Sequence, residues 1–456
     1  MKRLFLRFVV YLITLVIFVG GVGVFQFMSE QKNYWVAQRE QPVPAIENVA
    51  IPKHNTQKPT VAVVLGSPTT EVFDFMVPYK MFSMTNSYNV YAVAPTKDVT
   101  TLSGGLDLVP HYSFSELDEL LNEKSPDLIV IPYMPMVDED KYSPVRTWLQ
   151  KHSETNLLSI CGGSGNLADA GILKGKSATI HWQFFDKTKK YYTETNWIRD
   201  LRYVQDGNIV GTAGLTSGID GVLYVISQQL GEPIAEKIAK EMHYPSYHFV
   251  KNPKIDPYYV DLSEGVYFLN QAFQWNEKET GVLLYNGIED GALASIYDTY
   301  AAAGTSNVFS LSNLNQLIIT KHQLNIIPRY SLSNEPKKLD RIIVPGEEAR
   351  SLATEESKMW AEKVPNDLIY MHNDSPERFI FDAPLEDLAK QEDILTAKYG
   401  AKRLEYRSTT LDFKGIPFSI EAFGNALITI LISLFIAFFI DRRFILKKKF
   451  TRRKVA

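Results

Sequence analysis

Residues 156–174 read NLLSICGGSGNLADAGILK. The apolar run 157–160 has the length of a buried strand, and it is followed by a turn at Cys161-Gly162 and by a helical stretch that ends near Gly171. A strand, a tight turn and a helix in this order predict a nucleophile elbow, in which the side chain at the turn stands clear of the sheet. The small residues after Cys161 let the chain turn sharply and let a substrate approach the backbone.

Cys161 is the only cysteine among 456 residues, so it cannot form an intramolecular disulfide. The helix after it would direct free N–H groups and its positive dipole end at the sulfur, which favours the thiolate. The alternative is a small buried hydrophobic residue that happens to end a strand. The local pattern leaves both interpretations open.

Two apolar segments lie near the ends of the chain. Residues 4–28 contain an uncharged run of membrane-spanning length after Arg7, and residues 417–440 contain a second run after Glu421. A cleaved signal peptide is the alternative for the first run. That run is long for a signal peptide, and no small-x-small cleavage pattern follows before Met28, so we expect an uncleaved anchor.

Basic residues lie outside both predicted spans. Lys2, Arg3 and Arg7 come before the hydrophobic part of the first span, and the tail 441–456 follows the second with Arg442, Arg443, Lys447, Lys448, Lys449, Arg452, Arg453 and Lys454. The positive-inside rule places both termini in the cytoplasm, which makes this a two-pass protein of the cell membrane with its main domains extracytoplasmic. A single cysteine suits that compartment. The net charge of −4 argues against a nucleic-acid partner, and the position of the basic tail after a span favours a topology signal over a nucleic-acid patch.

Between the spans, segments of strand and helix character alternate. This order predicts an α/β fold with a mostly parallel sheet and helices on both faces. Active sites of such sheets lie at the carboxyl ends of the strands, where Cys161 falls. The expected strands are 60–66, 88–94, 127–131, 157–160, 176–182 and the start of 208–220, and the expected helices are 71–86, 143–152, 221–230 and 233–242.

Three longer motifs occur in a specific order: EVFDFMVPYKMF (71–82), SICGGSGNLADAGILKGKSATIHW (159–182) and GTAGLTSGIDGVLYVISQQLG (211–231). Together they resemble the ThiJ/PfpI family of the class I glutamine amidotransferase-like superfamily. The similar branch includes isonitrile hydratase and the input domains of AraC-type regulators. The resemblance implies a flavodoxin-like parallel sheet sandwiched by helices.

The resemblance also implies roles for four residues. Cys161 is the expected nucleophile, Asp74 the acid beside the thiol, His181 the histidine of the Thr-x-His-Trp motif, and Gly162 a backbone N–H donor to an oxyanion. A solvated helix position is the alternative for Asp74, although its apolar neighbours favour burial. A structural histidine is the alternative for His181.

One departure from the family pattern bears on turnover. The family usually has Pro-Gly-Gly after the strand that precedes the nucleophile strand, and its backbone supplies the second oxyanion donor. Here residues 131–135 read Ile-Pro-Tyr-Met-Pro, and Pro135 has no N–H to donate. The sequence thus puts oxyanion stabilisation in doubt.

The second half of the chain repeats the pattern of the first. Residues 280–348 resemble 60–132, with Thr280 aligned to Thr60. Extending the alignment places 367–372 over 156–161, which puts His372 at the nucleophile position. We therefore expect a truncated, degenerate second α/β copy that packs on the first as an intramolecular pseudo-dimer, with a homodimer as the alternative.

The predicted organisation has seven parts. They are a cytoplasmic N-terminus and transmembrane helix (1–28), a linker (29–58), the domain with the Cys elbow (59–250), a connector (251–278), the degenerate copy (279–415), a second transmembrane helix (417–440) and a basic cytoplasmic tail (441–456).

Three functions remain open. The first is a Cys-dependent hydrolase, hydratase or lyase that acts on a small molecule. The second is a non-catalytic ligand-sensing or scaffold domain pair on the membrane, and the third is a redox sensor in which Cys161 is oxidised to the sulfinate. No metal or cofactor is expected.

Overall fold

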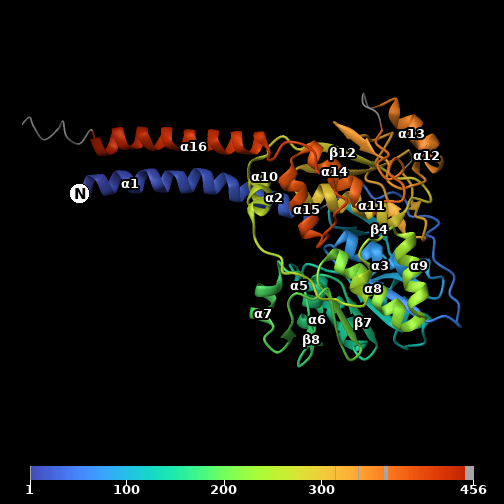
Figure 1. Cartoon of the computed structure of the whole chain (residues 1–456). Coiled ribbons are helices and arrows are strands. Elements are labelled where there is room, and N and C mark those ends of the chain that lie inside the picture. The colour runs from blue at the N-terminus through green and yellow to red at the C-terminus, as the bar shows by residue number, and fades with distance from the viewer. Residues whose placement is uncertain (1, 38, 314, 337, 364–367, 447–456) are drawn as a thin grey trace, which may run out of the picture.

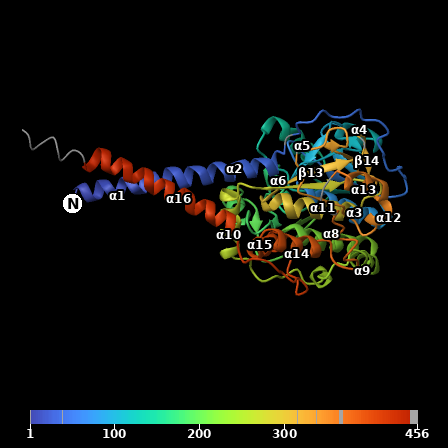
Figure 2. The same ribbon diagram turned by 90° about the horizontal axis from the view of Figure 1, so that it is seen from above.

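The computed structural model describes all residues except 1, 38, 314, 337, 364–367 and 447–456. Two helical segments form a rod that projects from a globular part (Figures 1 and 2). The first runs without a break through α1 (Lys2–Leu15), η1 (Val16–Gly20) and α2 (Gly21–Trp35), and the second through α16 (Ile420–Ile440) and η4 (Asp441–Leu446). Among the described residues, these two segments are long and apolar enough to cross a membrane.

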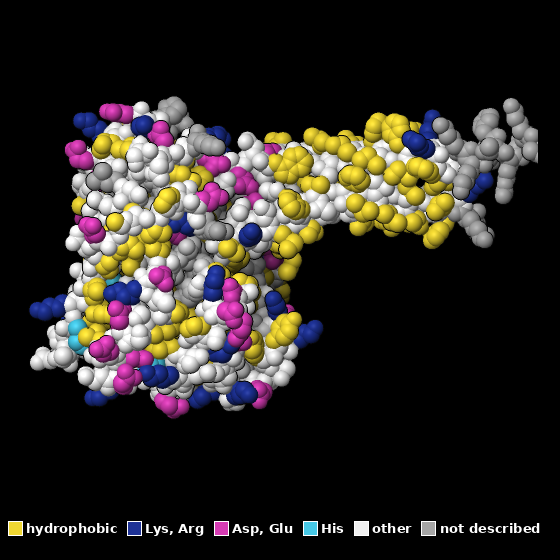
Figure 3. Space-filling model, turned by 180° about the vertical axis from the view of Figure 1, so that it is seen from behind, with side chains coloured by type: hydrophobic (Ala, Val, Ile, Leu, Met, Phe, Trp, Pro, Cys, Tyr) yellow, Lys and Arg dark blue, Asp and Glu magenta, His cyan; other side chains and the backbone are white. Residues whose placement is uncertain are grey.

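The rod is a pair of helices in contact along their length. Near its free end, Arg7 Nε donates to Asp441 Oδ2 at 2.9 Å. The tail from 447 onward, which holds most of the basic residues of the predicted cytoplasmic tail, lies outside the described residues. Side chains on the rod are mainly apolar and exposed (Figure 3).

The first helix is longer than the sequence suggested. It continues past residue 28 to Trp35 and enters the globular part, where Tyr34 and Ala37 are buried. The predicted linker 29–58 thus begins as helix. It lacks regular secondary structure only from about residue 36, where it runs over the surface to β1.

A seven-stranded sheet organises the first half, in the order β10-β11-β7-β6-β1-β2-β5. Only β10 is antiparallel to its neighbour, so the predicted α/β class with a mostly parallel sheet is confirmed. The strands are β1 (Thr60–Val64), β2 (Asn89–Ala94), β5 (Tyr112–Ser113), β6 (Leu128–Ile131), β7 (Asn156–Ser159), β10 (Tyr203–Asp206) and β11 (Ile209–Thr212).

Helices cover both faces of this sheet, because its central strands are apolar on both sides. Alternate residues of β1 point to opposite faces: Val61 and Val63 join the core under α3, and Ala62 and Val64 join the core under α5. One face carries α3 (Val72–Met84), α8 (Leu215–Leu230) and α9 (Glu232–Glu241); the other carries α4 (Phe114–Leu120), α5 (Glu139–Lys151) and α6 (Gly163–Asp169). This sandwich is consistent with the expected flavodoxin-like fold.

Two local predictions differ from the structure. The segment 176–182 contributes only β8 (Ser177–Ala178), which pairs with β9 (Asn196–Trp197) in a separate small sheet before α7 (Phe185–Tyr191). The predicted connector 251–278 contains a full helix, α10 (Leu262–Phe273), after the short η2 (Tyr247–Val250). Helix α10 packs against α2, α15 and α16 at the base of the rod (Figure 1).

The second half has a four-stranded parallel sheet in the order β16-β13-β12-β17. Four neighbouring strands of the first sheet, β5-β2-β1-β6, show the same pattern: the first strand of each half lies between the second strand and a later one. The strands are β12 (Lys278–Leu283), β13 (Ser306–Ser312), β16 (Tyr330–Ser331) and β17 (Arg341–Ile343). The helices are α11 (Asp290–Ile296), η3 (Tyr297–Ala301), α12 (Ala349–Leu352), α13 (Thr354–Ala361), α14 (Asp382–Gln391) and α15 (Ile394–Arg403).

The pairing corrects the alignment of the two halves by one residue. Thr280 lies opposite Arg341 and Val308, as Val61 lies opposite Leu128 and Val90. An alignment of the two halves by strand pairing thus places Thr280 over Val61 and not over Thr60. The bridge between residues 343 and 369 matches the pairing between residues 130 and 158, while residue 367 of the predicted last strand lies outside the described residues.

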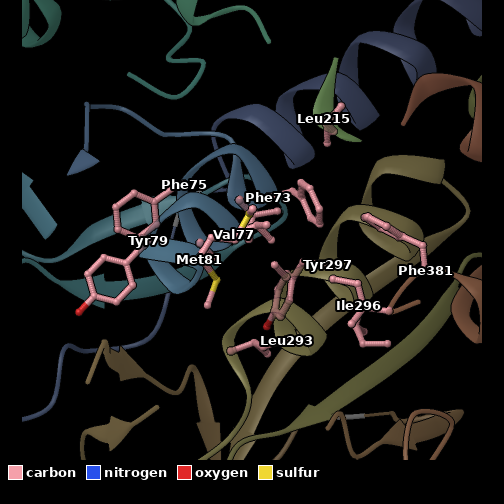
Figure 4. Packing of buried hydrophobic residues seen from close by; sticks show 14 of the residues in the cluster. Phe73, Phe75, Val77, Tyr79, Met81, Leu215, Leu293, Ile296, Tyr297 and Phe381 are labelled. Carbon is pink, nitrogen blue, oxygen red and sulfur yellow. The ribbon is translucent and has the colours of Figure 1, made fainter. Parts of the chain in front are cut away.

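A third sheet joins the halves, in the order β14-β15-β4-β3. Its strands are β3 (Thr100–Leu102), β4 (Leu106–Val109), β14 (Ile318–Ile319) and β15 (Asn325–Ile327), and β4 pairs with β15 across the boundary. Close by, α3 packs against α11. Figure 4 shows Phe73 and Val77 of α3 in one cluster with Leu293, Ile296 and Phe381 of the second half.

Candidate active site

The turn after β7 has the geometry of an elbow. Cys161 has a φ of +56°, a left-handed conformation that side chains with a Cβ rarely adopt, and α6 begins two residues later. A Cβ at Gly162 would lie 2.3 Å from the Tyr133 ring, and one at Gly163 would lie 2.0 Å from the Ile131 carbonyl oxygen. Both glycines are therefore required by close packing, and the turn places a buried thiol at the carboxyl end of the sheet.

Asp74 lies beside this thiol and not in solvent. It is in the first turn of α3, is fully buried, and interacts with the Cys161 thiol. Its Oδ2 accepts from the Tyr133 N–H at 3.3 Å, while Oδ1 is buried without a hydrogen-bond partner. Burial, and then the nearby Asp298, raise the pKa of Asp74 well above its usual value, which favours the protonated carboxyl.

The surroundings of Cys161 do not favour the thiolate. Burial raises the pKa of the Cys161 thiol well above its usual value, and Asp74, Glu71 and Glu405 raise it further. The Gly162 N–H acts in the opposite direction by hydrogen bonding to the sulfur. The short helix α6 does not outweigh burial and three carboxyl groups, so the expected thiolate stabilisation is not found.

His181 lines the same pocket but is held by the backbone. Its Nε2 lies 2.9 Å from the Arg403 carbonyl oxygen, and its Nδ1 accepts from the Gln183 N–H at 3.3 Å. Burial lowers the pKa of His181, which keeps the ring neutral with its proton on Nε2. Neither ring nitrogen is free to take a proton from Cys161.

The loop 131–135 offers no free N–H at the place of the missing glycines. The Tyr133 N–H donates to Asp74, and the Met134 N–H donates to Asn166 Oδ1 at 3.2 Å. Pro135 has no N–H. The remaining donor is the predicted one, Gly162, and its N–H hydrogen bonds to the Cys161 sulfur.

The end of the first long helix forms part of the site, which the sequence did not suggest. The Tyr34 hydroxyl lies 3.1 Å from Glu71 Oε1 and 3.0 Å from Asp298 Oδ1. The Trp35 ring stands edge-on to the Tyr133 ring, with centroids 5.2 Å apart. Residues that precede the α/β domain thus close the site from one side.

The end of α15 and the residues after it close the site from the other side. Arg403 forms a buried ion pair with Asp298, and Glu405 accepts from the Gly214 N–H at 2.7 Å and from the Ser217 hydroxyl. No motif marks Tyr34, Arg403 or Glu405 in the sequence.

These residues enclose a cavity of about 240 Å³ at the thiol. It is lined by Phe27, Gln31, Tyr34, Trp35, Glu71, Tyr133, Cys161, His181, Gln183, Phe184, Leu215, Tyr267, Phe268, Ala302, Tyr399 and Arg403. A larger hollow of about 630 Å³ shares none of these residues and has a more polar lining that includes Lys278 and Arg341. We take the smaller cavity as the candidate site because it contains the strained cysteine.

Over the part of the chain that the structure describes, no group of three or more His, Cys, Asp or Glu side chains is arranged to hold a metal ion. Of the predicted site residues, Cys161 and His181 line the same pocket, Asp74 interacts with the Cys161 thiol, and the Gly162 N–H hydrogen bonds to its sulfur.

The sequence profile of the DJ-1/PfpI family matches residues 59–228. Isonitrile hydratase of Pseudomonas putida is 29% identical over 182 residues, which cover 39% of this chain and 75% of that protein. The HTH-type transcriptional regulator CdhR of Pseudomonas aeruginosa is 33% identical over 96 residues, 21% of this chain and 28% of that protein. Protein DJ-1alpha of Drosophila melanogaster is 36% identical over 86 residues, 19% of this chain and 38% of that protein.

Solved structures of the same kind are also similar. A ThiJ/PfpI family protein from Pseudomonas syringae is 23% identical with a TM-score of 0.36, covering 46% of this chain and 84% of that chain. An AraC family transcriptional regulator from Pseudomonas putida is 16% identical with a TM-score of 0.34, covering 41% of this chain and 99% of that chain.

Proposed function

Because residues 59–228 form a domain of the DJ-1/PfpI family, related to isonitrile hydratase and to the input domains of AraC-type regulators, we propose that Cys161 and Asp74 form the active site of a hydratase-type enzyme. The substrate is a small molecule with a polarised carbon–nitrogen multiple bond. The observation that carries the proposal is the buried carboxyl of Asp74 beside a cysteine held at a strained elbow.

The reaction needs a nucleophile and a proton donor. The Cys161 sulfur bonds to the electrophilic carbon and one proton passes to the substrate; in an isocyanide both join the terminal carbon, which gives a thioimidate. Asp74 relays this proton because its raised pKa keeps the carboxyl protonated near neutral pH. Water then adds to the same carbon, and the sulfur leaves with a proton, which regenerates Cys161. The net change is the addition of one water molecule.

A hydratase fits this site better than an amidase or another acyl-transfer hydrolase. Acyl transfer builds an oxyanion that usually needs two preorganised N–H donors. The N–H groups of Tyr133 and Met134 are already bonded to Asp74 and Asn166. Addition to a carbon–nitrogen multiple bond needs an acid instead. In this scheme Gly162 supports the sulfur, and His181 fixes the turn that carries Arg403.

The test is turnover by the purified full chain in detergent. With benzyl isocyanide as probe, we expect formation of N-benzylformamide, followed by mass spectrometry. Cys161→Ala should abolish it and Asp74→Asn should reduce it by roughly 10²–10⁴-fold. Product formation that survives Cys161→Ala would rule the mechanism out.

Ligand sensing is the second candidate, and one observation favours it. Tyr34 and Trp35 line the pocket and belong to the long helix that continues into the rod. Binding of a ligand in the pocket would therefore change the contacts of that helix. A sensor would bind its ligand with equal affinity in Cys161→Ala. A redox sensor is less favoured, because the pKa of the buried thiol is raised, whereas oxidation requires an accessible thiolate.

We also propose that the two long helices span the cell membrane, with both termini in the cytoplasm and residues 29–416 outside. Their length and apolar surface support this. In a Cys161→Ala background, a membrane-impermeant thiol reagent added to intact cells should label Glu154→Cys but not Arg3→Cys. The opposite labelling would reverse the topology.

Residues 279–415 are, in our proposal, a degenerate second copy that serves as a built-in partner. The strand order supports this, and so does the pairing of β4 with β15. Leu108 pairs with Ile326, the residue at the same position of the second half. On either side, Val109 pairs with Asn325 and Asp107 with Ile327, as a two-fold axis through the central pair would require. Such a self-complementary contact is typical of a two-fold interface. If a 55–250 fragment is a well-behaved monomer that never binds a 275–415 fragment, the idea fails, and a homodimer becomes the alternative.

A further inference from the structure

We propose that the pocket at Cys161 takes an uncharged, lipophilic small molecule that enters from the membrane and not from water. The inference rests on the active site and the membrane topology proposed above. It names the class of molecule that the site selects and the route by which it arrives.

The lining of the pocket is largely aromatic. Eight of its residues carry aromatic rings other than histidine: Phe27, Tyr34, Trp35, Tyr133, Phe184, Tyr267, Phe268 and Tyr399. The cavity of about 240 Å³ is smaller than the roughly 300–1,000 Å³ of sites for drug-sized ligands. It therefore fits a small apolar group with one reactive end at Cys161.

The charged groups of the pocket are already paired. Glu71 Oε1 lies 3.1 Å from the Tyr34 hydroxyl, and Oε2 accepts from the Asp74 N–H at 2.7 Å. Arg403 is paired with Asp298, which is fully buried. A charged ligand would lose its hydration here without gaining a free counter-charge, which strongly opposes its binding.

The mouth of the pocket lies where the rod joins the globular part. Phe27 of α2 and Phe268 of α10 are in contact, with ring centroids 5.5 Å apart, and Phe268 is 48% exposed. Phe27 is in the last turn of the proposed span 4–28, and Tyr34 lies about 10 Å further along the same helix. The pocket thus runs from the end of the span to the buried site.

Further apolar side chains are exposed on the two helices that carry Phe27 and Phe268, or just before them. Tyr259, Val260 and Leu262, at and before the start of α10, are exposed, as is Met28 on α2. Helix α10 packs against both helices of the rod, at its base in Figures 1 and 2. A bilayer around the rod would cover these side chains, which explains an apolar surface that water would otherwise face. Molecules dissolved in the lipid reach the mouth directly.

The test measures access to Cys161 in the full chain, embedded in phosphatidylcholine nanodiscs. Three methanethiosulfonates share one reactive group: the neutral benzyl, the anionic sulfonatoethyl and the cationic trimethylammonioethyl reagents. Each rate is divided by the rate with a cysteine peptide in solution. We expect the benzyl reagent to be favoured by about tenfold or more over both ions, because the pocket offers no free counter-charge.

Phe268→Glu should remove this preference by placing a charge at the mouth. Tyr191→Glu changes an exposed aromatic residue on α7, outside the pocket lining, and should leave it intact. Equal normalised rates for the three reagents, equal behaviour of the two variants, or a folded protein that reacts with none of them would each overturn the proposal. The assay needs no turnover, so a failed hydration of benzyl isocyanide would contradict the proposed chemistry and not the route of entry.

Discussion

At Cys161, the surroundings of one residue oppose the effect of the helix that follows it. The helix N-terminus favours a thiolate, but the sulfur is buried and faces Asp74, Glu71 and Glu405, so the pKa of the thiol is raised. Both groups therefore favour their protonated forms, and the proposed reaction uses them as a pair that exchanges a proton and not as a preformed thiolate beside an inert carboxyl group. A weakly ionised thiol also resists oxidation.

Asp74→Asn should lower the pKa of the Cys161 thiol, because Asp74, although protonated near neutral pH, places a negative charge beside the sulfur once it ionises, and an amide does not. Alkylation by iodoacetamide would then begin at lower pH than in the unmodified chain, while turnover falls. Asp169→Asn, at the end of α6 and away from the pocket lining, is the control and should leave the alkylation profile in place. A thiol pKa that rises in Asp74→Asn would contradict the role given to Asp74.

The sequence alone predicted several individual residues of the candidate site. Cys161, Gly162 and Asp74 belong to short local motifs, and a motif of this kind fixes a turn or a helix start wherever it occurs. His181 was also found, but its hydrogen bond to Arg403 could not be, because Arg403 lies 222 residues further along the chain.

Among the elements, α2 and α10 show what a local pattern does not reveal. The apolar run predicted a span but not that the helix continues to Trp35, because the contacts that hold Tyr34 come from Glu71 and Asp298. Helix α10 did have a signal: Asp261 and Glu264 form a capping box at its start. The repeat in the second half was readable, but Thr280 was aligned one residue away from the position that the strand pairing gives it.

Tyr34→Phe should lower the free energy of unfolding by about 1–3 kcal/mol, because Glu71 and Asp298 would lose a buried hydrogen-bond partner. Thermal unfolding of the full chain in detergent measures this effect. Tyr191→Phe, which changes an exposed tyrosine, should stay within about 0.5 kcal/mol of the parent. Equal midpoints for both variants would mean that the helix end is not anchored in the site.

The whole molecule is held together by polar contacts across the two halves as well as by the shared core. Asp107 on β4 is fully buried and accepts from both Arg39 and Arg329, the second of which lies beyond β15. Asp107→Ala should therefore cost about 3–5 kcal/mol, since it leaves two largely buried guanidinium groups without a counter-charge.

The matched control for Asp107 is Asp374, whose ion pair with Arg350 is exposed on both sides. Asp374→Ala should cost less than about 1 kcal/mol. Chemical denaturation of both variants compares the two. Similar losses would show that the buried pair does not join the halves.

Two buried histidines predict a dependence of stability on pH. Burial lowers the pKa of His111 and of His372 from 6.5 to about 4. In the unfolded chain both bind a proton near pH 6.5, whereas in the folded chain they do so only near pH 4. Stability is therefore full above pH 6.5 and is lost as the pH falls from 6.5 towards 4, by about 1.4 kcal/mol per pH unit for each histidine.

The midpoint of thermal unfolding, followed against pH, checks this dependence. Glutamine can keep the hydrogen bonds of His111 to the Ala92 N–H and the Gln323 carbonyl. The double variant His111→Gln, His372→Gln should thus flatten the curve between pH 6.5 and 4, and His243→Gln at the surface should not. An unchanged slope in the double variant would assign the loss to other groups.

The order of the pocket residues along the chain has a consequence for synthesis. Tyr34 and Trp35 are made before the α/β domain and Arg403 long after it, yet all three line the pocket at Cys161. A growing polypeptide therefore has no finished pocket until residue 403 has left the ribosome. Chains that stop before residue 403 would carry a thiol without this enclosure, so the chemistry proposed for Cys161 requires residues on both sides of the α/β domain in the sequence.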